Sequence, residues 1–262
     1  MNGFLQDLRY GWRTLAKSPG FTVVAVLTLA LGIGANSSIF SLINAVLLRS
    51  LPFKEPDRLV MVWERRASSN DSNLPVSAHE FVAWREQARS FEKMAIIRGD
   101  GFTLTGAGDP MSIAALRVSS DFFPVLDVAP ILGRTFSPEE DQGASNPIVV
   151  LNASLWKGRF GSDPDIVEKT VTLSDQKYIV IGVMQRRCVG SWLNADPDVW
   201  LPIDLPDEAR RVGRHGNNVI ARLKPDVTLE QAQAELAQVA EQLERQYPNN
   251  NVGHGVKVDS LL

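Results

Sequence analysis

The residue types that most often carry chemistry are sparse in this sequence of 262 residues, and they lack catalytic spacing. The three histidines, His79, His215 and His254, are far apart in the chain and show none of the short spacings typical of metal ligands. Residues 154–157 (SLWK) match an S-x-x-K pattern, but neither S-D-N nor K-T-G follows them. No phosphate-binding loop and no H-E-x-x-H motif occurs in the sequence. We therefore predict no catalytic, cofactor-binding or metal-binding residues, and no enzyme activity.

The acidic candidates and the cysteine have simple interpretations. Asp196 and Asp198 flank a proline and mark the start of a strand, and the acidic stretch 139–141 is typical of a solvated loop. The single cysteine, Cys188, excludes an intrachain disulfide and a zinc site built from cysteines, so we interpret it as a small buried residue. A net charge of −3 without any basic tract argues against nucleic acid as a partner.

The longest apolar segment of the chain, residues 21–48, contains no charged side chain and would determine where the rest of the chain lies. A helix of this length would span roughly 42 Å, whereas a bilayer core of about 30 Å needs about 20 residues. We interpret the run as a transmembrane helix. The alternatives are a buried helix of a soluble core and a cleaved signal peptide, with residues 35–37 (ANS) at its cleavage site. The apolar residues that continue after that site argue against the signal peptide.

Residues 1–20 precede the apolar run and contain an amphipathic pattern over 4–17. Tyr10 and Trp12 are residues of the kind that anchor a helix at a membrane interface. We therefore predict a helix in the headgroup layer, in contact with membrane lipid; the alternative is an ordinary amphipathic helix on a protein surface. One face of this helix collects its apolar residues, Phe4, Leu5, Leu8, Trp12 and Leu15.

Small and polar residues interrupt the middle of the apolar run, at spacings that place most of them on one side of a helix. Small residues four apart let two helix backbones approach closely, and a polar amide that faced lipid would be unfavourable. The alternative is that small residues are simply common in membrane helices. A packing face needs a partner helix, and this sequence holds no second long apolar run. We predict a helix-packing face made of Ala30, Gly34, Asn36, Ser38, Ser41 and Ala45.

The remaining residues, 49–262, have the mixed composition of a soluble domain and predict the α+β class. Ser77 with Glu80, and Thr228 with Gln231, stand in capping-box positions at the start of two predicted helices. Apolar runs and period-two alternation predict the strands. The predicted helices cover 77–91, 152–161 and 228–247, with a further short helix and loop within 120–136. The predicted strands cover 56–64, 94–105, 111–118, 147–151, 170–184 (a hairpin), 197–203, 217–225 and 256–262.

The order of several segments resembles the N-terminal part of MacB-type ABC transporter permeases, particularly the bacterial group that lacks a fused ATPase. The resemblance covers essentially the whole chain. The segments are QDLRYGWRTLAKSPGFTVVAVLTLALGIGANSSIFSLINAVLLRSLPF, EPDRLVMVWE, DFFPVLDVAPILGRTFSPEED, IVVLNASLWKGRFGSDPDIVEKTVTLSDQKYIVIGVM and DVWLPI.

This resemblance implies a location that charge counting leaves open, since large domains cross the membrane largely regardless of charge. It implies the bacterial inner membrane, a cytoplasmic N-terminus, a single crossing in this chain, and a main domain on the periplasmic or extracellular side. In the family, three further membrane helices follow, with an FtsX-like arrangement. The implied parts are a cytoplasmic interfacial helix (1–20), a transmembrane helix (21–48) and a bilobal core domain (49–262), with a porter-like lobe at about 50–95 and 215–262 and an inserted β-rich lobe at about 96–212.

The function that the resemblance implies is the N-terminal portion of a permease subunit. Such a subunit transmits ATPase-driven motion to an extracytoplasmic domain for efflux or export. The expected partners are membrane lipid, the remaining permease helices or a second permease copy, and a separate ABC ATPase that binds through segments absent from this sequence. The alternative is a membrane-anchored extracytoplasmic module for binding or scaffolding, without transport activity.

Overall fold

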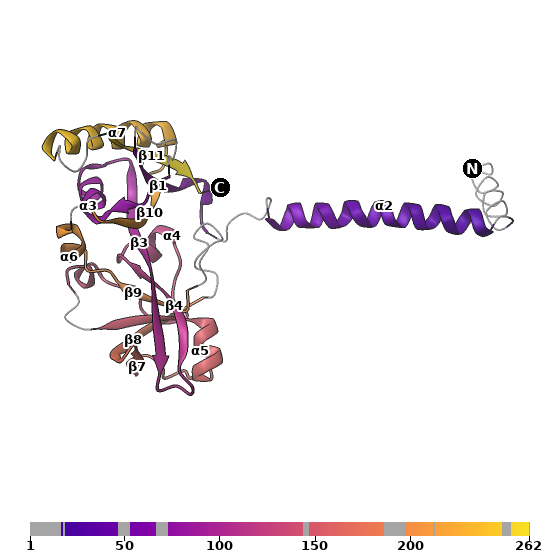
Figure 1. Ribbon diagram of the computed structural model, residues 1–262, viewed down its shortest axis with the longest axis horizontal. Helices are drawn as coiled ribbons and strands as arrows, with labels where there is room; N and C mark the ends of the chain where they lie inside the picture. The colour runs from indigo at the N-terminus through magenta and orange to yellow at the C-terminus, as the bar shows by residue number, and fades with distance from the viewer. Residues whose placement is uncertain are drawn as a thin grey trace. The chain divides into compact units, whose positions relative to one another are not determined.

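The computed structural model forms two compact units, Met1–Ser50 and Leu51–Leu262. In the first unit one continuous helix is described, α2 (Pro19–Val46) (Figure 1). The predicted interfacial helix of residues 1–20, with Tyr10 and Trp12, lies almost wholly outside the described residues and stays a prediction. The structure describes residues 17, 19–46, 53–66, 73–143, 147–185, 197–211, 213–247 and 253–261.

The described part of α2 starts at Pro19 and includes the first 26 residues of the apolar run, 21–46. Large apolar side chains along α2 are more than half exposed, among them Phe21 at 71% and Leu31 at 73%. Within the described residues, no helix meets both the length and the apolar character that a membrane crossing requires.

The second unit is mixed α and β, which confirms the predicted α+β class. Its helices are η1 (Pro56–Arg58), α3 (Ala78–Gln87), α4 (Phe122–Leu126), η2 (Pro138–Asp141), α5 (Ala153–Phe160), α6 (Leu205–Arg210) and α7 (Leu229–Gln246). Its strands are β1 (Leu59–Arg66), β2 (Val76–Ser77), β3 (Phe91–Thr105), β4 (Met111–Val118), β5 (Leu132–Gly133), β6 (Ile148–Asn152), β7 (Thr170–Leu173), β8 (Gln176–Met184), β9 (Val199–Pro202), β10 (His215–Leu223) and β11 (His254–Ser260).

These strands form one sheet of 11 strands within the described part of the chain, in the order β11-β1-β10-β3-β4-β9-β6-β8-β5. Strand β2 pairs with β10, and β7 pairs with β3 and β8. Most pairs are antiparallel, but β4 with β9 and β6 with β8 are parallel. Strands β3 and β4 run between the end of the domain that carries α7 and the end that carries β7, β8 and α5 (Figure 1).

Three groups of buried apolar side chains hold the domain together. The first lies between α3, α7 and the strands β1, β10 and β11. The second gathers the aromatic residues of α4 around Trp200, and the third fills the end that carries α5, β7 and β8. The predicted boundary between the lobes, at residues 95 and 96, falls inside the continuous strand β3. The division into porter-like and inserted lobes stays a prediction.

Local sequence signals account for several elements. The Ser77–Glu80 capping box at α3 and the Thr228–Gln231 capping box at α7 are both present. The predicted hairpin is β7 and β8, joined by two residues with positive φ, Ser174 at 45° and Asp175 at 67°. That backbone is the type I′ turn geometry whose twist suits a two-residue hairpin.

The acidic stretch 139–141 corrects the sequence interpretation of a solvated loop. It belongs to η2, and the Asp141 side chain is buried. Its carboxylate accepts hydrogen bonds from the backbone N–H and the hydroxyl of Ser120, both at 2.8 Å. Burial raises the pKa of Asp141 to about 6, against the opposing effect of these hydrogen bonds. The sequence pattern showed three acids but not that one of them has a buried partner in a distant segment.

Candidate functional site

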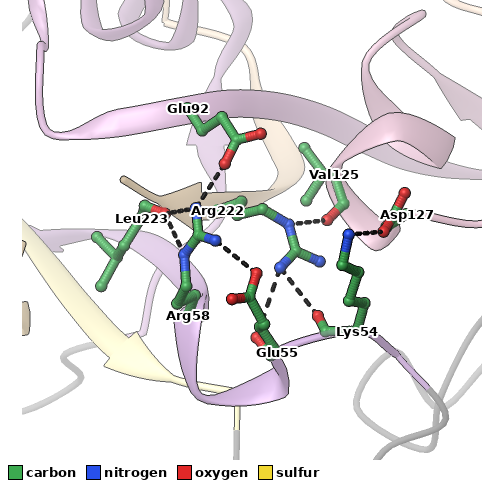
Figure 2. Close-up of polar contacts among 8 residues, drawn as sticks. All are labelled: Lys54, Glu55, Arg58, Glu92, Val125, Asp127, Arg222 and Leu223. Atoms are coloured by element: carbon green, nitrogen blue, oxygen red, sulfur yellow. Dashed lines mark hydrogen bonds and ion pairs between the residues drawn. The ribbon is translucent and has the colours of Figure 1, made fainter. Parts of the chain in front are cut away.

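A buried arginine joins the first residues of the domain to the middle of the sheet. Arg222 lies on β10 and is 4% exposed. Its Nε donates to the carbonyl of Val125 at 2.8 Å, and its Nη1 donates to the carbonyl of Lys54 at 2.9 Å (Figure 2). Val125 lies in the last turn of α4, where backbone carbonyls have no partner within the helix. One guanidinium therefore connects the segment before β1, the end of α4 and β10.

A second arginine extends these contacts. Nε of Arg58 and its Nη2 donate to the carbonyl of Leu223, at 2.9 and 2.7 Å. Its Nη1 binds the Glu55 carboxylate at 2.6 Å, and Nη2 also binds Glu92 on β3 (Figure 2). The carbonyl oxygen of the last residue of β10 therefore accepts two hydrogen bonds from Arg58, the residue that ends η1. We call Arg58, Arg222 and the partners that they contact the arginine network.

Glu55, within this network, has an unusual backbone. Its φ of 46° and ψ of 60° are left-handed, a conformation that costs a residue other than glycine roughly 1 kcal/mol. The bond from Arg58 to its side chain holds it there, and the Arg58 N–H also bonds to the Glu55 carbonyl at 3.0 Å. The chain thus turns sharply just before β1, and the arginine network fixes that turn.

The charges in the network are unequally exposed. Burial lowers the pKa of Arg222, and the neighbouring Arg58 lowers it further. An arginine nevertheless stays protonated in proteins, so the positive charge remains and the carbonyl dipoles stabilise it. The Lys54–Asp127 pair at 3.5 Å is largely exposed and contributes little. Arg222 is therefore the contact whose loss would leave buried groups unsatisfied.

The last described strand lies beside the first. β11 pairs antiparallel with β1, with Val60 opposite Ser260, and the N–H of Leu261 donates to the carbonyl of Leu59 at 3.0 Å. The segment before β1 and the segment after β11 therefore meet at the same end of the sheet. The arginine network lies at that end.

The predicted helix-packing residues all lie in α2. Ala30, Gly34 and Asn36 are exposed, and a Cβ placed on Gly34 would meet no atom within 4 Å. The side chains of Ser38, Ser41 and Ala45 are outside the described set. The packing face therefore stays a prediction.

Two of the three histidines meet in space, which sequence spacing did not reveal. Nδ1 of His215 and Nδ1 of His254 each lie 2.7 Å from an oxygen of Glu64. Burial, followed by the nearby Glu80, raises the pKa of Glu64, and burial lowers the pKa of His254. The sequence offered one indication of this cluster. Glu64 follows Val60 and Val62 at intervals of two residues on β1, so its acidic side chain lies on the same buried face of the strand. The third histidine, His79, is not part of this cluster. Its ring packs edge-on against Tyr247, with 4.9 Å between the ring centroids.

Comparison with protein families identifies the class of this domain. The family model described as MacB-like periplasmic core domain matches residues 22–239. The chain belongs to this family, which confirms the resemblance to MacB-type permeases. No curated protein shows a significant match to the chain.

Solved structures share the fold. A domain of a protein from Porphyromonas gingivalis has 16% identity and a TM-score of 0.63, over 81% of this chain and 93% of that one. The periplasmic region of MacB from Actinobacillus actinomycetemcomitans has 15% identity and a TM-score of 0.54, over 78% and 88%. The extracellular domain of the noncanonic ABC-type transporter YknZ from Gram-positive bacteria has 13% identity and a TM-score of 0.54, over 76% and 99%. At these identities the likeness concerns the fold alone.

Replacing Arg222 by methionine should destabilise the domain. The substitution keeps an apolar stem but leaves the Val125 and Lys54 carbonyls without their donor, so we expect a loss of roughly 2 to 4 kcal/mol in the free energy of unfolding. Chemical denaturation of the full chain in detergent measures it. Arg245→Met is the matched control: Arg245 is 75% exposed and bonds only to Glu241 among the described residues, so a change below about 0.5 kcal/mol is expected. Equal effects of the two substitutions would contradict the role assigned to Arg222.

Proposed function

We propose that this chain is the N-terminal portion of an ABC transporter permease subunit, and that its domain receives motion driven by an ATPase. The observation that carries the proposal is the match of most of the chain to a periplasmic core domain of MacB type. In this proposal the domain lies outside the cytoplasm and takes part in efflux or export, and no residue of the chain is assigned a catalytic role. The ATPase is a separate subunit that contacts other parts of the permease.

Helix α2 is proposed to anchor the domain in the cytoplasmic membrane, with the N-terminus in the cytoplasm. Residues 21–48 contain no charged side chain, and the apolar side chains described on α2 are exposed to a degree unusual for a soluble protein. Val24 and Leu29, for example, are 63% and 64% exposed. Lipid is the environment that suits such a surface, because burial of apolar area is the main favourable term.

Transmission of motion requires that the first residues of the domain stay firmly attached to its sheet. The arginine network supports this role, because it fixes the residues just before β1 to the central strand β10, to β3 and to the end of α4. A displacement applied to Lys54 and Glu55 would therefore move the sheet as a body instead of unfolding the segment. The neighbouring end of β11 provides a second point at which the same sheet can be moved.

The exposed small residues of α2 are proposed to receive another membrane helix. Gly34 has open space where a side chain would stand, and Ala30, one turn before it, is small. Asn36 would find a hydrogen-bond partner in such a contact, since amides facing lipid are unfavourable. The occupant is one of the remaining permease helices or a second permease copy.

The orientation of the domain can be tested with impermeant thiol reagents. In a Cys188→Ser background, Lys177→Cys places an exposed thiol on β8, and Lys17→Cys places one before α2. We expect Lys177→Cys to be labelled in intact spheroplasts and Lys17→Cys only after lysis. Labelling of Lys177→Cys only after lysis would contradict an extracytoplasmic domain and with it the permease proposal.

The packing face can be tested by replacing Gly34 with leucine. The added side chain disturbs nothing within the described chain, so it should act only on an approaching helix. We expect cross-linking in membranes, to a second copy or to a separately supplied permease segment, to fall about tenfold, the effect of 1.4 kcal/mol. The control is Ile33→Leu, which conserves volume at an adjacent position that is 65% exposed and should change little. If Gly34→Leu cross-links as well as the wild type, the small residues do not form a packing surface.

A further inference from the structure

Three side chains from three strands converge at the end of the sheet opposite the arginine network. Glu64 lies near the end of β1, and His215 and His254 are the first residues of β10 and β11. One donor atom from each, a carboxylate oxygen and two imidazole nitrogens, lies within 4.8 Å of the other two. His254 pairs with Arg66 across the strands, which directs it to the same face of the sheet as Glu64. The sheet itself therefore sets the position of the cluster.

The contacts in this cluster are short but are not hydrogen bonds. Both histidine nitrogens lie 2.7 Å from the Glu64 carboxylate. Even so, both carboxylate oxygens of Glu64 and Nδ1 of His254 are buried without a hydrogen-bond partner among the described residues. Buried polar atoms are nearly always paired, so atoms that converge without pairing indicate a missing partner. A partner that accepts lone pairs from all three side chains at once is a cation.

A second buried carboxylate, that of Glu80, lies beside the cluster. Glu64 is 1% exposed and Glu80, close by at the start of α3, is 4% exposed. One oxygen of Glu80 accepts from the Ser77 hydroxyl at 3.0 Å, while its other oxygen lies 3.9 Å from Nδ1 of His254. A cation bound by Glu64, His215 and His254 would therefore have a second buried carboxylate, that of Glu80, within reach.

We propose that Glu64, His215 and His254 form a binding site for a divalent transition-metal ion, with Zn²⁺ as the first candidate. Imidazole nitrogen with carboxylate oxygen is a donor set that suits zinc and its neighbours rather than Mg²⁺ or Ca²⁺. Donor atoms held at about 2.0 to 2.2 Å from one ion lie within about 4 Å of each other, so the cluster needs only small side-chain adjustments. Glu80 or a water molecule would supply the fourth donor.

The site has a route to solvent and a defined structural effect. His215 is 29% exposed, so an ion can reach Glu64, which lies beneath it. A bound ion would join the ends of β1, β10 and β11, the same strands whose opposite ends meet the arginine network or lie beside it. The proposed role is therefore structural: the ion would clamp the far ends of these strands together. This inference does not depend on the transport function proposed above.

The test uses the full chain in detergent, freed of metal with a chelator and then titrated with ZnCl₂. We expect one equivalent of Zn²⁺ to be retained, as measured by mass spectrometry of the metal content. At a hundredfold excess over Kd, Zn²⁺ should raise Tm by roughly 5 to 10 °C. His215→Ala should weaken binding by more than the roughly 10- to 100-fold that loss of an outer partner causes. Glu64→Gln should have the same effect.

His79→Ala is the matched control, since it removes the one histidine outside the cluster and should bind Zn²⁺ as the wild type does. If Glu64→Gln fails to fold, the partly exposed His215 still permits the comparison. Three results would each overturn the proposal: no stoichiometric Zn²⁺ in the wild type, no change in Tm on adding ZnCl₂, or equal Zn²⁺ affinity in wild type and His215→Ala.

Discussion

The structure of the domain depends on one buried positive charge, the guanidinium of Arg222. A charge that is removed from water must be compensated by dipoles or opposite charges, and here backbone carbonyls from Val125 and Lys54 provide that compensation. The same bonds satisfy carbonyls that the helix end and the turn before β1 would otherwise leave unpaired. The segment before β1, helix α4 and strand β10 are consequently fixed to each other, although they are far apart in sequence.

The sheet connects the arginine network to the rest of the domain. Strand β1 lies between β10 and β11, so a force applied near Lys54 passes into three hydrogen-bonded strands. Strand β3, which also contacts Arg58 through Glu92, continues past α4 into the end of the domain that holds α5 and the β7–β8 hairpin. In the proposed permease, this arrangement would move the domain as a body. The cluster of Glu64 with the two histidines lies at the far ends of the same strands.

Elements governed by neighbouring residues could be predicted from the sequence. The capping boxes at Ser77 and Thr228 and the hairpin turn at 174–175 place their elements because donor and acceptor are only a few residues apart. The contacts of Arg222 and the meeting of His215 with His254 join segments that only the sheet order brings together. In the sequence Arg222 interrupts the apolar stretch 219–223 of its strand, and Asp141 is one acid among three. Their partners could not be identified without the register of the strands.

The central claim is that Arg222 fixes the residues before β1 to the sheet, and amide hydrogen exchange of the full chain in detergent tests it most directly. In Arg222→Met, amides of residues 53–58 should exchange at least about tenfold faster than in the wild type, because their opening free energy falls by 1.4 kcal/mol or more. Amides in α7, which packs in the first apolar group whereas Val125 packs in the second, should be unchanged. Equal exchange of residues 53–58 in the two proteins would contradict the claim.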